Sequence, residues 1–331
     1  MTLLLSERDL AQVVGLEDAY AAAVDAFEGL AHGTGVLEPR LRLHLPAAAL
    51  NMMAAADVRA GVMGLKAYSV VGSGTSKGTG FTLQLFDIAS GELVAILAAD
   101  GLGNLRTGAA SAVATRTLAR PDSQTLSVIG TGWVARGQVD AVVSALPQIR
   151  TVLVSGRDPA RTEAFVAGVR GRTGLEVESL PAAAAVAAAD IVVTATSSAE
   201  PVLRGGWLQP GTHVNAVGSN AAGRAELDAD AVRRADVVVV DHAESASREC
   251  GDLLATPAVV EPLELGAVLT GAAVGRTDSA QVTLFESQGI AVLDVALGAR
   301  ALALARRAGI GTDIGDVLVA RPGRAASSVV H

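Results

Sequence analysis

The sequence predicts an α/β protein in which a doubly wound parallel sheet follows a part with a different pattern. From Thr125 on, short apolar runs alternate with helix-like stretches, which is typical of parallel sheets with helical crossovers. More than a hundred residues precede these runs, and their pattern predicts antiparallel strands. Half of the 331 residues are hydrophobic and few are aromatic, which suits Ala-rich helices packed on Val- and Ile-rich strands.

The first part begins with two predicted helices. Ser6 followed by Asp9 predicts a helix start, because a serine hydroxyl is a favoured cap for the first amides of a helix. A second helix is predicted from Leu16 to Leu30, where apolar residues recur at helical spacing until a Gly-rich break begins at His32.

The periodicity then changes to that of strands. Cationic and leucine side chains alternate over Arg40–Leu45, which predicts a strand with one cationic face and one leucine face. Further strands are predicted over Gly61–Val71, Phe81–Ile88 and Glu92–Ala98, so this part is expected to form an antiparallel meander. An Ala-rich helix over Leu105–Ala119 would lead into the second part.

The second part is predicted to be strand–helix–strand throughout. Its candidate strands are Leu126–Ile129, Thr151–Ser155, Ile191–Ala195, His213–Val217 and Val237–Asp241. Helices are expected in the gaps, notably over Val134–Leu146 and Pro159–Arg170, and this alternation predicts the parallel sheet. A long Ala-rich helix is expected over Ile290–Ala308, followed by a loosely structured tail over Arg321–His331.

A glycine motif of the G-x-G-x-x-A type directly follows the first of these strands. Gly130 permits the tight turn, and Gly132 lets the backbone approach a pyrophosphate at the N-terminus of the next helix. Ala135 takes the third small position, where the helix packs on the strand. The motif therefore predicts a dinucleotide-binding site.

The end of the second predicted strand bears on the choice of cofactor. An acidic residue there would bind the ribose 2′-hydroxyl of NAD, but Gly156 stands at that position, with Arg157 and Arg161 close by. A missing carboxylate and nearby guanidinium groups suit a 2′-phosphate, so NADP(H) is favoured. Alternatively, Asp158 is the ribose ligand and the strand ends two residues later, in which case NAD(H) is the cofactor.

Cationic residues in the first part are candidates for holding a carboxylate. They are Arg40, Arg42, Lys66 and Arg106. Arginine grips a carboxylate with two parallel hydrogen bonds, and lysine adds a point charge and a movable proton. Lys66 lies in an apolar stretch, where a lone amine would be costly without a partner. A solvated surface charge is an equally good interpretation for Arg42 and Arg120. Arg42, His44 and Lys77 could instead recognise a second carboxylate.

Polar loops follow two later strands, over residues 194–198 and 215–220. Because ligands bind at the carboxyl ends of parallel strands, Ser219 or Asn220 is expected to face the nicotinamide or the substrate. The alternative for both loops is a polar turn, followed in the second case by a helix capped near Glu226.

Composition and charge exclude several classes of function. The net charge of −8 argues against a nucleic-acid or acidic-membrane partner, and no apolar run reaches membrane-spanning length. The five histidines have no cysteine or acidic partners at metal-ligand spacing, so no metal site is expected. Cys250 is the single cysteine, and the N-terminus lacks the pattern of a signal peptide, so a cytoplasmic protein is expected.

The chain resembles the ornithine cyclodeaminase/μ-crystallin family over nearly its whole length. The resemblance is carried by motifs in a shared order: Pro39-Arg40, Gly64-Leu65-Lys66, Leu105–Ala110, Val128–Gly132, Ala195-Thr196, Asn215–Gly218, Glu226-Leu227-Asp228 and Val282–Gly289. It implies a Rossmann domain at 119–290 inserted into a discontinuous α+β substrate-binding and dimerisation domain, 1–118 plus 291–331. It also implies a homodimer formed through the substrate-domain sheets.

The same resemblance implies an activity and a set of site residues. It predicts an NAD(P)-dependent oxidoreductase acting on a small α-imino or α-amino acid, whose carboxylate is held by Arg40 or Arg42, Lys66 and Arg106. The cofactor is expected to contact Gly130, Thr131, Gly132, Val134, Ala135, Gly156, Arg157, Arg161, Ala195, Thr196, Val217 and Gly218.

One loop departs from the family pattern. Cyclodeaminases of the family carry a water-activating aspartate in the loop that here is Gly218-Ser219-Asn220, and a neutral amide accepts no proton near neutral pH. Ornithine cyclodeamination is therefore an alternative to imine reduction, and a non-catalytic NADPH-binding protein like the crystallin is another. In the favoured interpretation, Lys66 protonates the substrate or positions the water that does so, and Asn220 orients its nitrogen.

Overall fold

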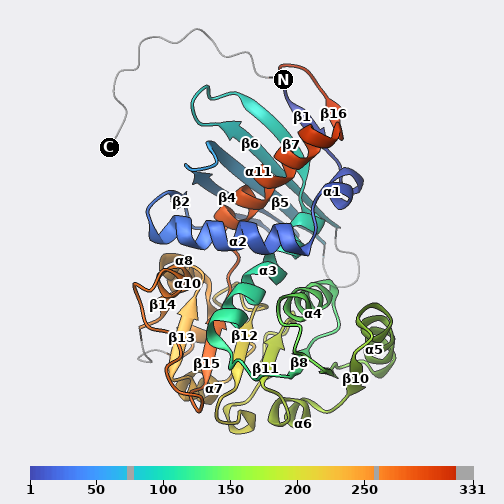
Figure 1. The fold of residues 1–331 in the computed structure, drawn as a ribbon, viewed down its shortest axis with the longest axis vertical. Helices are drawn as coiled ribbons and strands as arrows, with labels where there is room; N and C mark the ends of the chain where they lie inside the picture. The colour runs from blue at the N-terminus through green and yellow to red at the C-terminus, as the bar shows by residue number, and fades with distance from the viewer. Residues whose placement is uncertain (73–77, 257–260, 318–331) are drawn as a thin grey trace.

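The computed structural model describes residues 1–72, 78–256 and 261–317, and within them the chain forms two eight-stranded sheets (Figure 1). Sheet A is built from residues 3–98 together with 312–313, and sheet B is built from residues 125–286. Two expectations from the sequence, for Lys77 and for the tail Arg321–His331, lie outside the described residues.

Sheet A contains the predicted meander. Its strands are β1 (Leu3–Leu5), β2 (Gly35–Leu37), β3 (Leu41–Leu45), β4 (Ala48–Asp57), β5 (Val62–Val71), β6 (Gly78–Asp87), β7 (Leu93–Ala98) and β16 (Thr312–Asp313). Their order is β16-β1-β7-β6-β5-β4-β2, with β3 also paired to β4. Strands β4 to β7 pair antiparallel with their sequence neighbours, which confirms the antiparallel character of this part.

The sequence did not predict β4, the strand that joins the predicted hairpins to β2 and β3. Its Ala-rich stretch has weak strand propensity, yet it pairs along its whole length with β5 on one edge and with β2 and β3 on the other. Met53, Ala55 and Asp57 alternate onto the buried side of the strand. Pairing on both edges therefore outweighs the local preference.

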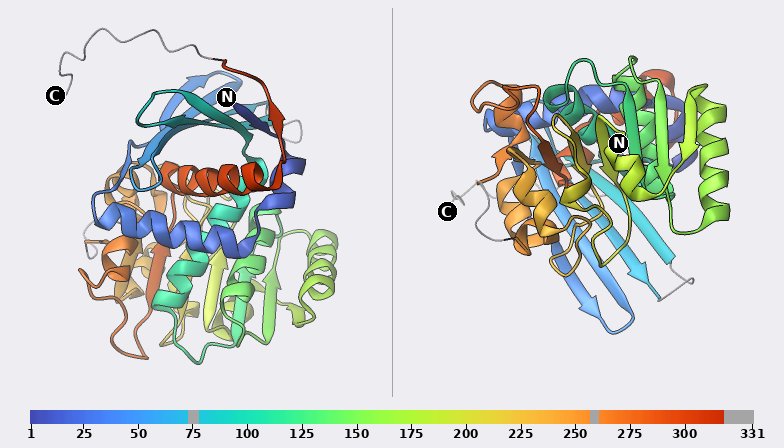
Figure 2. Two further views of the ribbon diagram at one scale, coloured as in Figure 1. Left: turned by 45° about the horizontal axis from the view of Figure 1, so that its top comes forward. Right: turned by 90° about the horizontal axis from the view of Figure 1, so that it is seen from below.

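The helices packed with sheet A are α1 (Glu7–Val13), α2 (Leu16–Ala31), α3 (Asp100–Leu118) and α11 (Ala291–Ala308). Ser6 caps α1 as predicted: its hydroxyl accepts from the Asp9 amide at 3.3 Å, and the Asp9 carboxylate accepts from the Ser6 amide at 2.9 Å. Helix α11 crosses one face of sheet A, and α2 packs against α11 (Figure 2).

Helix α3 begins five residues earlier than the predicted start at Leu105. The Glu7 carboxylate of α1 accepts hydrogen bonds from the amides of Asp100 at 2.8 Å and Gly101 at 3.1 Å. This cap is distant in the sequence, so no local pattern indicates it. The earlier start places Arg106 in the second turn of α3 rather than at its beginning.

Sheet B is the predicted doubly wound parallel sheet. Its strands are β8 (Thr125–Ile129), β9 (Thr151–Ser155), β10 (Glu176–Ser179), β11 (Ile191–Thr194), β12 (His213–Ala216), β13 (Val237–Val240), β14 (Leu263–Glu264) and β15 (Thr283–Glu286). Their order is β10-β9-β8-β11-β12-β15-β13-β14, and all neighbours pair parallel. The five predicted strands are confirmed to within one residue, whereas β10, β14 and β15 were not predicted.

Short helices surround sheet B. They are α4 (Trp133–Ala145), α5 (Pro159–Thr173), α6 (Ala182–Ala187), the 3-10 turn η1 (Gly205–Trp207), α7 (Ala229–Arg234), α8 (Ala243–Glu249), α9 (Gly251–Leu254) and α10 (Leu265–Leu269). The expectation of a helix capped near Glu226 was two residues off, because Asp228 caps α7 by accepting from the Ala231 amide at 2.8 Å. Across the described ranges, no helix combines the length and apolarity needed to cross a membrane.

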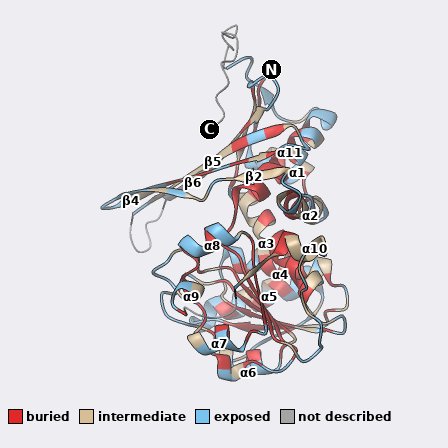
Figure 3. Ribbon diagram, turned by 90° about the vertical axis from the view of Figure 1, so that its left-hand side faces the viewer, coloured by how far each residue is buried: buried red, intermediate tan, exposed pale blue. Residues whose placement is uncertain are grey.

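The leucine face of β3 points to solvent in this single chain. Leu41, Leu43 and Leu45 are 62%, 54% and 59% exposed, respectively. Strands β4, β5 and β6 extend past the helices that cover the other face of sheet A (Figure 3). On the opposite, cationic face of β3, Arg42 is partly buried and contacts the loop after β12.

Candidate active site

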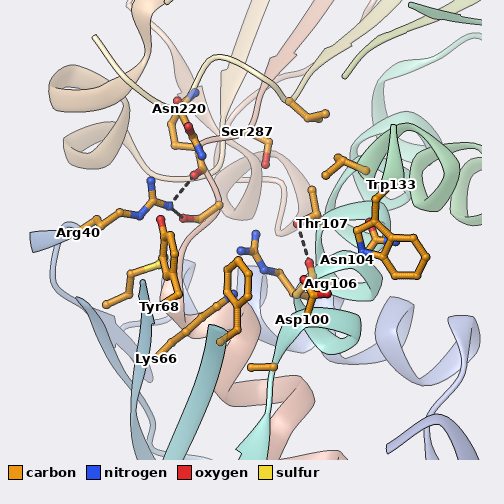
Figure 4. A pocket seen from close by; sticks show the side chains of 18 residues that line it. Arg40, Lys66, Tyr68, Asp100, Asn104, Arg106, Thr107, Trp133, Asn220 and Ser287 are labelled. Carbon is orange, nitrogen blue, oxygen red and sulfur yellow. Dashed lines mark hydrogen bonds between the residues drawn. The ribbon is translucent and has the colours of Figure 1, made fainter. Parts of the chain in front are cut away.

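A pocket of about 220 Å³ lies between sheet A and the carboxyl ends of the sheet B strands (Figure 4). Its walls come from β4 to β6, the first turns of α3, the loop after β12, and the segment 287–289 ahead of α11. Residues proposed from the sequence converge here, namely Arg40, Lys66, Arg106 and Asn220. The fold thus brings three cations and one amide to a single cavity.

A buried carboxylate that the sequence analysis missed joins two of these cations. Asp294 of α11 is fully buried, and its Oδ1 accepts from the Lys66 ammonium at 2.7 Å and from Nε of Arg106 at 3.1 Å. Its second oxygen, Oδ2, has no hydrogen-bond partner among the described residues. A lone acid in an apolar helix was the available signal, because such a charge needs a buried partner.

The electrostatics of this triad follow from burial and mutual attraction. Burial is the largest influence on Lys66 and lowers its pKa to about 8, Asp294 opposes that shift, and Arg106 adds to it by repulsion. Burial opposes ionisation of Asp294, but the attraction of Arg106 and Lys66 leaves its pKa below the ordinary value. Asp294 therefore favours the protonated form of Lys66, and the two cations favour the carboxylate form of Asp294.

The two arginines near β3 have different surroundings. Arg40 lines the pocket, and its guanidinium donates to Glu249 at 2.8 Å and to the carbonyl oxygens of Gln288 and Gly289 at 2.9 and 2.8 Å. Arg42 lies outside the described pocket lining and donates to the carbonyl oxygen of Asn220 at 2.6 Å. Arg40 is thus placed to meet a ligand, while Arg42 holds the loop that carries Asn220.

Glu249, at the end of α8, forms ion pairs with both arginines and so links them to the part of the chain that contains sheet B. Its carboxylate lies 2.8 Å from Arg40 and 3.3 Å from Arg42. Burial raises the pKa of Glu249, against the lowering influence of both guanidinium groups. No local pattern in the sequence indicates this contact, because Glu249 and Arg40 are 209 residues apart.

The rest of the pocket wall is mixed. Sheet A contributes apolar and aromatic side chains, whereas α3 and the segment ahead of α11 contribute polar ones, Asp100, Asn104, Thr107, Ser287 and Gln288. The rings of Tyr68 and Phe81 stack with centroids 4.9 Å apart and an interplanar angle of 16°. The Lys66 ammonium lies 5.5 Å from the centroid of Phe81, and Met53 lies beside it on β4. The opposite wall includes Val217, from the loop after β12. The apolar side of the pocket suits a small, flat, mostly apolar group next to a carboxylate.

A second cavity, of about 450 Å³, lies at the N-terminal ends of α4 and α5. Gly130 has φ of 124°, and a Cβ there would lie 2.4 Å from the carbonyl oxygen of Ala195, so the turn requires glycine. A Cβ on Gly132 would meet no atom within 4 Å, so the backbone is open to a ligand at the start of α4. Ala135 is fully buried against sheet B. This geometry fits a pyrophosphate at a helix N-terminus.

The residues expected to contact a cofactor divide between the two cavities. The second cavity is lined by Gly130, Thr131, Gly132, Gly156, Arg157, Arg161, Ala195 and Thr196, and the first by Val134 and Val217. Ala135 and Gly218 are outside the described linings of both. Ala135 packs α4 on the sheet, and the Gly218 amide is bonded to a buried carboxylate.

The edge of the second cavity near β9 carries cations. A side chain at Gly156 has no room, because its Cβ would lie 2.3 Å from the Thr162 hydroxyl oxygen. Asp158 also lines this cavity, but its carboxylate caps α5 by accepting from the Arg161 amide at 3.1 Å. Arg157 and Arg161 are exposed at the same edge.

Glu226 holds the two strand-end loops together. Its carboxylate accepts from the Thr194 hydroxyl at 2.9 Å, from the amide and hydroxyl of Thr196 at 2.6 Å each, and from the Gly218 amide at 2.7 Å. It is fully buried, and burial raises its pKa. Glu226 is thus a structural anchor of both loops, which positions Thr196 at one cavity and Asn220 at the other.

Comparisons with known proteins agree on one family. The family model described as ornithine cyclodeaminase/mu-crystallin matches residues 2–302 of the chain. A Δ(1)-pyrroline-2-carboxylate reductase of Bacillus cereus is 37% identical over 248 residues, which are 70% of this chain and 74% of the relative.

Solved structures show the same fold. The Δ(1)-pyrroline-2-carboxylate reductase of Thermococcus litoralis, in complex with NADH and L-proline, matches with a TM-score of 0.89 and 30% identity over 94% of this chain and all of its own. An archaeal alanine dehydrogenase dimer with bound NAD matches with a TM-score of 0.88 and 29% identity, covering 95% of this chain and 99% of that one.

Proposed function

The chain belongs to the ornithine cyclodeaminase/mu-crystallin family, and from this premise we propose that it is an NAD(P)-dependent reductase of a small α-imino monocarboxylic acid. One observation carries the proposal: Arg40, Lys66 and Arg106 line a pocket that also includes Trp133 and Val134, the residues directly after Gly132 of the glycine-rich cavity. Three cations next to a dinucleotide cradle suit a carboxylate substrate that exchanges hydride with a nicotinamide.

We assign a different role in the reaction to each polar side chain of the pocket. The guanidinium groups of Arg40 and Arg106 hold the substrate carboxylate, and Lys66 gives a proton to the imine nitrogen or positions the water that does so. Asn220 orients that nitrogen by hydrogen bonding. The glycine-rich cavity would hold the pyrophosphate of a dinucleotide, and the nicotinamide of that dinucleotide would supply the hydride. Because imine reduction adds one hydride and one proton, these groups account for both.

A single carboxylate fits the pocket better than two. Arg42 is outside the described lining of the pocket and His44 is exposed on β3, so neither is placed to bind a second carboxylate in the pocket. The stacked pair Tyr68 and Phe81 offers an apolar wall instead. We therefore favour a cyclic α-imino acid over a dicarboxylic one.

The proposed function is tested by a substrate screen that follows NADPH or NADH oxidation. Pyrroline-2-carboxylate, piperideine-2-carboxylate, pyruvate with simple amines, and oxaloacetate with ammonia would be compared at equal concentrations. Cyclic imino acids are expected to give the highest kcat/KM. Cofactor oxidation with none of these substrates would contradict the proposal, and a preference for oxaloacetate with ammonia would contradict the monocarboxylate assignment.

We propose that NADPH binds more tightly than NADH. The support is the pair of exposed arginines at the cavity edge and the lack of room for an acidic side chain at Gly156. Arg157→Ala is expected to narrow the difference in binding free energy between NADPH and NADH by about 1–3 kcal/mol, the range for a charged hydrogen bond. Isothermal titration of both cofactors measures it, with Arg204→Ala as a control outside the cavity lining. Tighter NADH binding by the wild type would overturn the preference.

We also propose a cytoplasmic homodimer whose interface is the uncovered face of sheet A. The exposed leucines of β3 support this face, and a similar solved protein is a dimer. Contiguous apolar surface of this kind is typical of subunit contacts. The single free cysteine, Cys250, is consistent with a reducing compartment.

A further inference from the structure

The described charged groups around Lys66 act in opposite directions on its pKa. Arg106 approaches from α3 and Arg40 from the segment before β3, and both act to lower the pKa of Lys66. Strands β4 and β6 contribute the uncharged side chains of Met53 and Phe81. Asp294 of α11 is the described acid in direct contact with the ammonium, at 2.7 Å.

These surroundings disfavour a protonated lysine unless a carboxylate opposes them. Lys66 is 2% exposed, and moving an ammonium group from water into such a site favours the neutral amine. Two neighbouring guanidinium groups add repulsion of the same sign. A neutral Lys66 would neither attract a carboxylate nor supply a proton to an imine nitrogen.

We infer that Asp294 is a positioning residue that keeps Lys66 protonated before the substrate binds and aligns it with Arg106. The alignment is visible in the geometry, since a single oxygen, Oδ1, accepts from both cations. The anchor is rigid, because Asp294 lies in the first turns of an eighteen-residue helix that is buried against sheet A. Asp294 itself lies outside the described pocket lining, so it acts through Lys66 and Arg106 rather than on the substrate.

The inference rests on the proposed function for the ligand class but makes a separate prediction. Loss of the Lys66 proton is expected to weaken carboxylate binding as pH rises through about 8, and this fall in affinity is called the alkaline limit below. Removing the Asp294 charge removes the main opposing influence. Asp294→Asn is therefore expected to move this limit to lower pH by about 1–3 units, the range for loss of an adjacent opposite charge.

The experiment measures the affinity of the NADPH-loaded protein for pyrrole-2-carboxylate across this pH range. The probe stays a monoanion throughout, so the limit reports the protein. Lys66→Arg is expected to abolish the limit, because a guanidinium does not titrate here. Asp18→Asn is the matched control, because Asp18 pairs at 2.8 Å with Arg300 on the exposed side of α11. In this variant the alkaline limit on probe binding should stay at the wild-type pH. An unchanged limit in Asp294→Asn would overturn the inference.

A measurement on the wild type covers the case in which Asp294→Asn does not fold. NMR of lysine labelled with ¹³C at Cε gives the Lys66 titration directly, with Lys66→Arg assigning the signal. A pKa near 8 is expected, and a Lys66 that is neutral at pH 7 would overturn the inference. Failure of the wild type to bind the probe at any pH would contradict the proposed function instead, and the NMR titration would still test whether Lys66 is protonated before the substrate binds.

Discussion

Arg106→Ala is expected to lower kcat/KM for the imino acid by roughly two to four orders of magnitude, while NADPH affinity stays within a few-fold. Arg106 lines the substrate pocket, and it is outside the described lining of the dinucleotide cavity. Losing a buried partner of a carboxylate costs about 3–5 kcal/mol, which corresponds to this range of rates. Steady-state kinetics and isothermal titration of NADPH measure the two quantities.

The controls separate substrate binding from stability. Arg116→Ala, at an exposed site on the same helix, should leave kcat/KM near the wild-type value. Arg106→Lys keeps the charge next to Asp294 but loses the two-pronged grip, and it should remain strongly impaired. Near-normal efficiency of Arg106→Ala, or loss of NADPH binding without loss of catalysis, would show that Arg106 does not hold the substrate.

With L-ornithine and NAD, the wild type is expected to form no appreciable proline, although the same preparation reduces its imino acid. Hydrolytic loss of ammonia needs a base for water, and the Asn220 amide at the pocket offers none. Glu226 is not a substitute, because it is fully buried and its carboxylate already accepts four hydrogen bonds. Mass spectrometry of the reaction mixture measures proline directly.

A variant of the same residue adds a second test. Asn220→Asp should lower the rate of imine reduction or leave it unchanged, because reduction needs alignment of the nitrogen and no base at this position. Proline formed by the wild type at many turnovers per minute would contradict the reductase assignment and favour the cyclodeaminase. NADPH binding without turnover of any imino acid or of ornithine would instead favour a non-catalytic binding protein.

The fold class and the dinucleotide cavity could be predicted from the sequence because their signals are local. The cap of Ser6 and Asp9 involves residues within one helical turn, and the turn at Gly130 requires glycine because of its own φ. Apolar runs also marked five strands of sheet B, since strands buried on both faces need continuous hydrophobic residues.

Elements whose stability comes from distant partners could not be placed in this way. Strand β4 is held by pairing with β2, β3 and β5 and is Ala-rich, so it carries no strong strand signal of its own. The start of α3 depends on Glu7, which caps it from another helix. In both cases tertiary contacts outweigh local propensity.

For the site, the sequence by itself determined which residue types are present, and the tertiary structure decided how they are paired. Lys66 in an apolar stretch already required a partner, but only folding identifies Asp294, 228 residues later, as the side chain that pairs with it. Folding likewise separates Arg40, which lines the pocket, from Arg42, which holds the Asn220 loop. The physical reason is that a buried charge needs a counter-charge within a few ångströms, and chain packing alone determines which one lies there.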